Sequence, residues 1–90
     1  MQVRNAEDRS RYELRVDGVL VGVADYRIDG DRIVFPHTEI TASRRGQGLG
    51  AELVRGALDD VRTTGRRVVA HCWFVRDFID DNADYADLAA

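Results

Sequence analysis

The segment 44–51, with the sequence Arg-Arg-Gly-Gln-Gly-Leu-Gly-Ala, constrains the fold of this chain more than any other. Its glycines Gly46, Gly48 and Gly50 lie between an extended stretch and an amphipathic stretch. Glycine reaches left-handed backbone conformations and has no Cβ to cover nearby amides. Where a helix begins, those amides point outward and the helix dipole favours negative charge. The segment therefore predicts a strand–loop–helix unit whose loop binds a phosphate.

The residues after the loop predict a helix, a strand and a second helix. Apolar residues recur at helical spacing through residues 49–64, and Gly65 follows as a C-terminal cap. Residues 67–73 form a near-continuous apolar run, typical of a strand buried on both faces. A short helix is expected over residues 74–80. The acidic tail, residues 81–90, is expected to fray, although Tyr85 and Leu88 could dock.

The residues before the loop predict antiparallel strands joined by tight turns. Residues 12–16 alternate like a strand, Asp17-Gly18 is a hairpin turn signal, and residues 19–28 are rich in β-branched side chains. A third extended region covers residues 32–41. Proline cannot donate to a ladder, so a break is expected at Pro36, giving strands near 32–35 and 37–41.

Together these elements predict one α+β domain spanning residues 1–90, with helices packed on a mostly antiparallel sheet. A strand–helix–strand crossover makes its two strands parallel neighbours with right-handed sense. On the wet face of the long helix, Arg55 and Asp59 have the spacing of an ion pair.

Charge and cysteine content exclude several classes of protein. The formal net charge of −3 argues against a nucleic-acid binder. One cysteine, Cys72, excludes an internal disulfide and a multi-cysteine zinc site, so no metal is expected. No apolar run has the length of a membrane span and no signal peptide is visible, so a cytoplasmic location without membrane contact is expected.

Three kinds of phosphate loop can be compared with the glycine segment. A Walker A loop ends in Gly-Lys-Ser/Thr, and this chain has no lysine. A dinucleotide fingerprint needs Gly-x-Gly-x-x-Gly, which the spacing of these glycines does not match. Arg45-x-x-Gly48-x-Gly50 resembles the Arg/Gln-x-x-Gly-x-Gly/Ala signature of the GNAT acetyltransferase superfamily. The segment His37-Thr38-Glu39-Ile40 before the loop, with residues 71–75 and Tyr85 after it, is similar to a small single-domain branch of that superfamily.

The resemblance implies a reduced GNAT-like fold that binds acetyl-CoA and transfers its acetyl group to an amine. The pantetheine arm of the coenzyme would enter a gap between the strands on either side of the loop–helix unit. Ile40 would supply a backbone N–H to the thioester carbonyl, and Arg45 would add charge or hold the loop. The pyrophosphate would be bound by the loop and helix start, at Gly46, Gln47, Gly48, Gly50 and Ala51.

The resemblance also implies three candidate catalytic residues. His37 or Glu39 could remove the amine proton, directly or through water; in a regular strand the two share a face, although Pro36 could disturb this. Cys72 could protonate the leaving thiolate or take the acetyl group itself. Many GNAT enzymes carry a tyrosine acid on the following helix, but Phe78 stands at the matching position here. Trp73, where this branch often has proline or a smaller residue, could be a core residue.

The sequence leaves two further functions open beside acetyl transfer. One is a non-catalytic acetyl-CoA or CoA-binding module that senses the ligand or regulates a partner. The other is an interaction protein that binds no coenzyme. The tight turns between the first strands leave little chain to build an acceptor site, so the acceptor would be a protein, a peptide or a small amine reaching an open surface.

Overall fold

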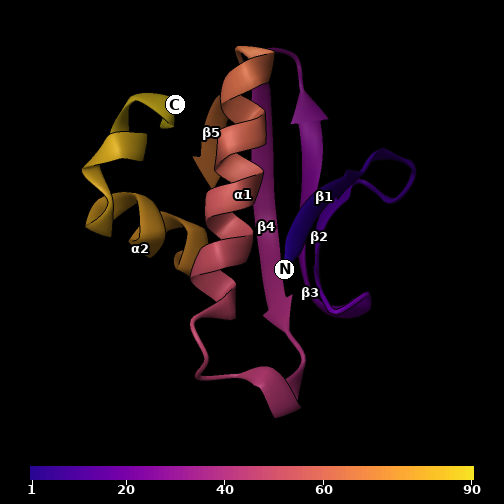
Figure 1. Cartoon of the computed structure of the whole chain (residues 1–90). Helices are drawn as coiled ribbons and strands as arrows, with labels where there is room; N and C mark the ends of the chain where they lie inside the picture. The colour runs from indigo at the N-terminus through magenta and orange to yellow at the C-terminus, as the bar shows by residue number, and fades with distance from the viewer.

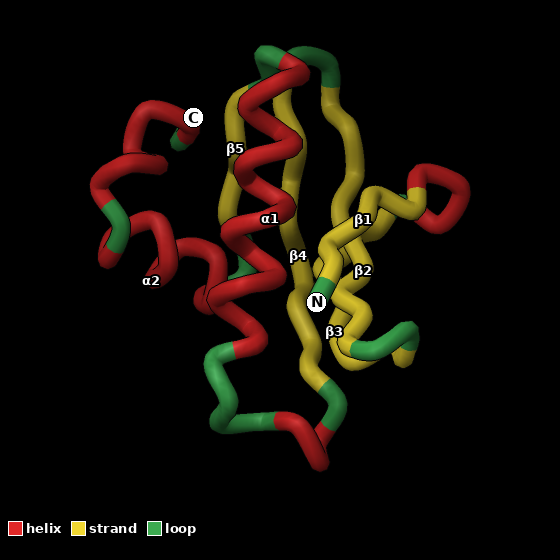
Figure 2. Tube along the Cα trace, viewed as in Figure 1, coloured by secondary structure: helices red, strands yellow, loops and turns green.

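The computed structural model describes residues 1–90, which form a five-stranded sheet with two α-helices (Figures 1 and 2). Three short 3-10 helices connect or extend these elements. None of the helices is both long and apolar enough to cross a membrane. The elements in chain order are β1 (Gln2–Ala6), η1 (Glu7–Arg9), β2 (Arg11–Val16), β3 (Val19–Asp29), β4 (Arg32–Ile40), η2 (Ala42–Arg44), α1 (Leu49–Thr64), β5 (Arg67–Ala70), α2 (Trp73–Asp81) and η3 (Ala83–Leu88).

The strands follow one another across the sheet in the order β1-β2-β3-β4-β5. The first four pair antiparallel, and β5 pairs parallel to β4 after the α1 crossover. Helix α1 lies along one face of the sheet, and α2 and η3 pack beside it next to β5 (Figure 1). The predicted α+β class, with its strand–loop–helix–strand unit, is therefore confirmed.

The core lies between α1 and the sheet. The apolar positions that predicted α1 are buried, including Leu53, Leu58 and Val61. Backbones also approach closely here: a Cβ placed on Gly56 of α1 would lie 2.6 Å from the Cβ of Val3 in β1. Strand β1, which the sequence pattern did not predict, is thus held both by its ladder to β2 and by α1.

Pro36 does not break β4, contrary to expectation. The register between β3 and β4 slips by one residue between Asp25 and Arg27, so that the extra residue is accommodated beside Pro36 while the strand continues. Pairing with β5 does stop here, because Phe35 and Ala70 form the last pair of that ladder. The proline marks the place where β4 and β5 part.

The end of the chain departs from the predicted pattern in three ways. Strand β5 is shorter than expected and lies at the sheet edge, with only Val68 of its four residues buried. Trp73 is not a core residue, since it begins α2 and is 64% exposed. Tyr85 and Leu88 are buried, each about 6% exposed, and the backbone N–H of Ala90 donates to the carbonyl of Val68.

The hydroxyl of Tyr85 connects η3 to α1. It donates to Asp59 Oδ1 at 2.7 Å and accepts from Arg55 Nη1 at 3.5 Å. The expected surface pair of Arg55 with Asp59 is therefore replaced by a bridge in which both side chains contact this hydroxyl.

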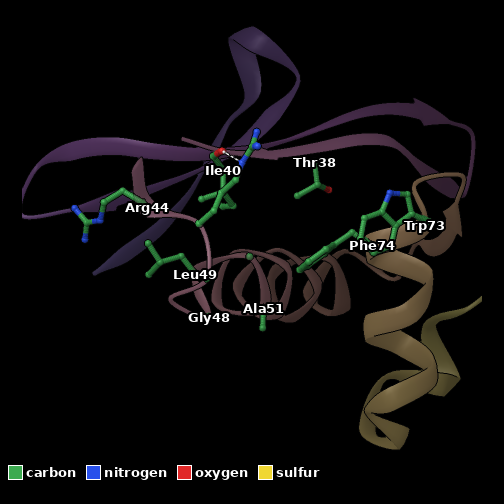
Figure 3. Close-up of a pocket in the computed structure, with 11 residues that line it drawn as sticks. Thr38, Ile40, Arg44, Gly48, Leu49, Ala51, Trp73 and Phe74 are labelled. Atoms are coloured by element: carbon green, nitrogen blue, oxygen red, sulfur yellow. Dashed lines mark hydrogen bonds between the residues drawn. The ribbon is translucent and has the colours of Figure 1, made fainter. Parts of the chain in front are cut away.

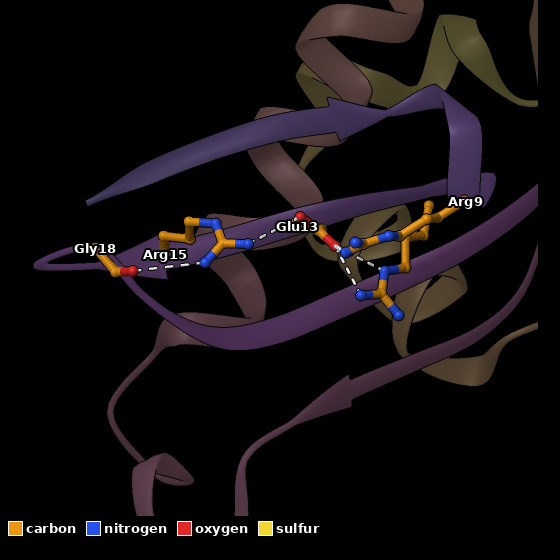
Figure 4. A network of polar contacts seen from close by, with 5 residues as sticks. Arg9, Glu13, Arg15 and Gly18 are labelled. Carbon is orange, nitrogen blue, oxygen red and sulfur yellow. Dashed lines mark hydrogen bonds and ion pairs between the residues drawn. The ribbon is translucent and has the colours of Figure 1, made fainter.

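The face of the sheet opposite α1 carries no helix, and we call it the open face (Figures 3 and 4). Glu13 of β2 lies on it and is only 4% exposed. Arg11 Nε donates to its carboxylate at 2.8 Å, and Arg9 and Arg15 lie within 3.4 Å (Figure 4). The hydrogen bond from Arg11 keeps the pKa of Glu13 below its ordinary value, against the opposing effect of burial.

Candidate functional site

The glycine loop leads into α1 with two left-handed residues. Gly46 has φ +81° and Gly48, the residue before the helix, has φ +75°. A Cβ at either position would meet no atom within 4 Å, so backbone conformation and not crowding requires glycine there. No side chain caps the helix start. The first amides of α1 therefore have no side-chain partner and point outward from the helix start.

A cleft of about 550 Å³ opens over this helix start, between β4, the loop and the beginning of α2 (Figure 3). Thr38 and Ile40 extend from β4 toward α1, while Trp73 and Phe74 close the other end. The Phe74 ring lies directly over Gly50, where an added Cβ would be 2.6 Å from its tip. The lining residues are Thr38, Ile40, Arg44, Arg45, Gly46, Gly48, Leu49, Gly50, Ala51, Trp73 and Phe74.

The ladder between β3 and β4 determines where the Ile40 amide points. The N–H of Thr41 donates to the carbonyl of Val21 at 2.8 Å. Because antiparallel amides alternate in direction, those of Thr38 and Ile40 point away from β3. Strand β5 no longer pairs with β4 at these positions. The Ile40 N–H thus faces the gap between the parted strands, where the resemblance placed it.

Gly22 leaves room for the Ile40 side chain on the α1 side of the sheet. It lies directly opposite Ile40 in the ladder, and an added Cβ would be 2.5 Å from Ile40 Cδ1. The isoleucine side chain therefore lies over β3, in space that only a glycine leaves open.

The two neighbouring arginines of the loop have different partners. Arg45 Nε donates to the carbonyl of Ile40 at 3.1 Å, which ties the loop to the end of β4 (Figure 3). Arg44 Nε donates to Gln47 Oε1 at 3.2 Å, and Arg44 is one of the residues that line the cleft. The side chain of Gln47 therefore holds Arg44 and does not line the cleft itself.

Cys72 lies behind the cleft wall and not in it. It is 9% exposed, and its N–H donates to the carbonyl of Phe35 at the end of the β4–β5 ladder. Its Sγ donates to Oγ1 of Thr38 at 3.6 Å. Thr38, which the sequence reasoning did not select, therefore separates the thiol from the cleft. Thr38 and Ile40 are two residues apart and so share a face of β4, a spacing that could have identified Thr38 as a second cleft residue.

His37 and Glu39 lie on the open face. Side chains alternate along a strand, and Glu39 pairs through Val23 with Glu13, which is on that face. His37 Nε2 and Glu39 Oε1 are 3.9 Å apart, with side chains 55% and 60% exposed. The two thus share a face, but the structure does not bring them into the cleft with Ile40 and Thr38.

The geometry therefore presents two sides of one strand. On the α1 side, the cleft combines free helix-start amides, an outward backbone N–H and the Thr38 hydroxyl, with the Cys72 thiol behind it. On the open side, a histidine and a carboxylate stand close together and accessible to solvent. The cleft residues outside the predicted set are Thr38, Arg44, Leu49, Trp73 and Phe74.

Comparison with known proteins gives one family and a consistent fold. Residues 11–88 match the family described as GCN5-related N-acetyl-transferase. Protein NATD1 of Bos taurus is 31% identical over 84 residues, which cover 91% of this chain and 74% of that protein. Protein NATD1 of Gallus gallus is 30% identical over 84 residues, covering 91% and 76%.

Solved structures are similar at lower sequence identity. The NMR structure of a GCN5-like protein from Staphylococcus aureus has a TM-score of 0.74 at 20% identity, covering 99% of this chain and 87% of that one. The crystal structure of the ribosomal-protein-S18-alanine N-acetyltransferase from Escherichia coli has a TM-score of 0.64 at 19% identity, covering 73% and 44%. These two likenesses concern the fold.

Proposed function

Because this chain belongs to the GCN5-related N-acetyltransferase (GNAT) family, we propose that it transfers the acetyl group of acetyl-CoA to an amine. The observation that carries the proposal is the cleft over the start of α1. The cleft combines the uncapped start of a helix, which suits a pyrophosphate, with an outward amide at Ile40, which suits a thioester carbonyl.

In this proposal the coenzyme occupies the α1 side of the sheet. The amides around Gly46, Gly48, Gly50 and Ala51 bind the pyrophosphate, and Arg44 adds positive charge. Arg45 and Gln47 contribute by holding the loop and Arg44, respectively. The Ile40 N–H donates to the thioester oxygen, where negative charge develops as the amine attacks.

The acceptor approaches from the open face, through the gap that β5 leaves beside β4 beyond Phe35. Its nitrogen forms a bond to the acetyl carbon while the carbon–sulfur bond breaks. Glu39 or His37 takes the amine proton, directly or through water, since both are exposed on that face. The leaving thiolate takes a proton from the part of the cleft wall behind which Cys72 lies. No helix covers the open face, so a protein, a peptide or a small amine could reach it.

A second candidate function is a coenzyme-binding module without turnover. Phe78 favours it, because this buried residue of α2 stands where many GNAT enzymes carry a tyrosine acid. The two functions share the coenzyme site and differ in the chemistry.

Thermal unfolding with acetyl-CoA, with CoA and with neither tests the shared site. Ligand at a hundredfold excess over its dissociation constant stabilises the native state by about 2.7 kcal/mol, so we expect a clear rise in melting temperature. No rise at near-millimolar coenzyme would refute both candidates. Release of CoA in the presence of spermidine or a lysine peptide then separates the enzyme from the binding module. Glu39→Gln and Cys72→Ala should lower turnover; if both variants keep full turnover, the catalytic assignment is wrong.

A further inference from the structure

The thiol assigned to the leaving-group side of the reaction does not reach the cleft. Cys72 is 9% exposed and is absent from the cleft lining, whereas Thr38 belongs to it. The one side-chain hydrogen bond of the thiol is its donation to the Thr38 hydroxyl oxygen. The hydrogen-bonded path from this thiol to the cleft therefore leads through the Thr38 hydroxyl.

Thr38 is placed for contact with the sulfur of a bound thioester. It precedes Ile40 by two residues on the same face of β4, so the two positions are about 7 Å apart along the strand. Both follow Phe35, the last residue paired with β5. With its carbonyl oxygen at the Ile40 amide, a thioester whose C–S bond points along β4 toward Thr38 would bring its sulfur to the end of the cleft where Figure 3 shows the Thr38 hydroxyl.

The hydroxyl of the buried Tyr85 is occupied elsewhere. Tyr85 donates to Asp59 and accepts from Arg55, and it does not line the cleft. Phe78 has no hydroxyl. Among the residues lining the cleft, Thr38 is the one with a hydroxyl group.

We propose that the Thr38 hydroxyl is the group that protonates the leaving sulfur of CoA, and that Cys72 acts through it as the proton source. The proposal rests on the acetyl transfer proposed above. As the carbon–sulfur bond breaks, the sulfur takes the Thr38 hydroxyl proton, and the Thr38 oxygen takes the proton of the Cys72 thiol. The net change is one proton moved from Cys72 to CoA, with Thr38 restored.

The chemistry of the pair suits this relay. A threonine hydroxyl alone is a poor acid, but a hydroxyl that accepts a hydrogen bond becomes a better donor. The residual charge then resides on the Cys72 sulfur, as a thiolate, and not on the Thr38 oxygen. Cys72 directly precedes α2, a position where the helix dipole favours negative charge. Water returns the proton to Cys72 after the product leaves.

The single cysteine of this chain allows a test that needs no acceptor amine. In Cys72→Ser, the serine hydroxyl can replace the thiol as donor to Thr38, and the CoA sulfur becomes the sole thiol in the complex. Ultraviolet absorbance of the thiolate then reports the pKa of bound CoA. Burial raises the pKa of the three tyrosines, Tyr12, Tyr26 and Tyr85, which keeps their ionisation apart from that of the thiol.

We expect the thiol pKa of CoA bound to Cys72→Ser to lie below that of free CoA by about half a unit or more, because donation from Thr38 stabilises the thiolate. In Thr38→Val/Cys72→Ser the shift should disappear while CoA still binds; Thr38→Ala/Cys72→Ser serves if the valine variant does not fold. Equal pKa values with and without the Thr38 hydroxyl would overturn the relay. Failure of the wild-type protein to bind CoA would instead refute the proposed function and the relay with it.

Turnover provides the second readout, with Thr38→Ser as the matched variant that keeps the hydroxyl. Where CoA release occurs, Thr38→Val should lower kcat about 100-fold with little change in the KM for acetyl-CoA, and Thr38→Ser should restore most of it. Unchanged kcat in Thr38→Val, beside a wild-type enzyme that turns over, would reject the relay and leave acetyl transfer standing.

Discussion

At the scale of single residues, the two arginines of the loop show that neighbours in sequence can have separate tasks. Arg45 donates a hydrogen bond to the Ile40 carbonyl at the end of β4. Arg44 lines the cleft and is oriented by Gln47. In the coenzyme complex proposed above, the charge available to the pyrophosphate is therefore that of Arg44, although the family signature includes Arg45.

Substitution of each arginine by glutamine separates these tasks. Arg44→Gln should weaken CoA binding about tenfold and reduce its dependence on ionic strength, since it removes a charged contact, with the melting temperature of the free protein unchanged. Arg45→Gln should lower that melting temperature by freeing the loop from β4. Calorimetric titration at two salt concentrations measures the first effect, and Arg76→Gln, on the exposed side of α2, is the control. If Arg45→Gln alone changes the salt dependence, the tasks are reversed.

Glu13 predicts a loss of stability in acid. Its pKa in the folded chain is lowered below 4.5 by the hydrogen bond from Arg11, so the unfolded chain takes up the proton at higher pH. The stabilisation is complete above pH 4.5 and is lost as the pH falls through the lowered value. Urea unfolding at pH 7 and below pH 4 should show Glu13→Gln less stable at pH 7 and less sensitive to acid. Glu52→Gln, at an exposed carboxylate of α1, should keep the acid sensitivity of the wild type; an equally steep decline in Glu13→Gln would contradict the assignment.

At the scale of elements, sequence periodicity predicted α1 well because its apolar face is continuous and glycine follows its last turn. It did not predict β1, because Gln2, Arg4 and Asn5 have no strand-like alternation, and the strand depends on its ladder to β2 and on α1. The expected break at Pro36 was wrong for a related reason. The one-residue shift in register between β3 and β4 depends on both strands, so the sequence of β4 alone could not predict it.

The contact of α1 with β1 can be measured with two glycines of the same helix. Alanine in place of either glycine gains about 1 kcal/mol in helix propensity. At Gly50 the added Cβ meets the tip of the Phe74 ring, which can turn aside, whereas at Gly56 it meets the Cβ of Val3. We expect Gly56→Ala to be destabilised by about 1–3 kcal/mol in urea unfolding, and Gly50→Ala to be nearly neutral. Equal free energies of unfolding for the two variants would show that β1 can move away from α1 without loss of stability.

At the scale of the whole molecule, the candidate site depends on one strand with two differently used faces. The resemblance implied that Ile40 and the glycine loop belong to one site, and the strand, loop and helix that carry them are consecutive in the chain. The sequence could not predict that Thr38 would separate Cys72 from the cleft, or that Trp73 and Phe74 would close its end. Those placements follow from where β4 and β5 part and from how α2 turns back toward α1, which are properties of the assembled sheet.

The last segment of the chain completes this assembly, because η3 packs against both α1 and α2. Leu88 is 6% exposed in the common core, and the Tyr85 hydroxyl bridges to Asp59 and Arg55. Leu88→Ala should reduce the free energy of unfolding by about 2–3 kcal/mol, a large share of the stability of a domain this small. Urea unfolding measures it, and Asp84→Ala, at an exposed side chain of the same segment, should have little effect. If Leu88→Ala is as stable as Asp84→Ala, then α1, α2 and the sheet fold without support from this segment. If Leu88→Ala instead unfolds in a single transition at a lower urea concentration than the wild type, the segment and the candidate site belong to one cooperative unit.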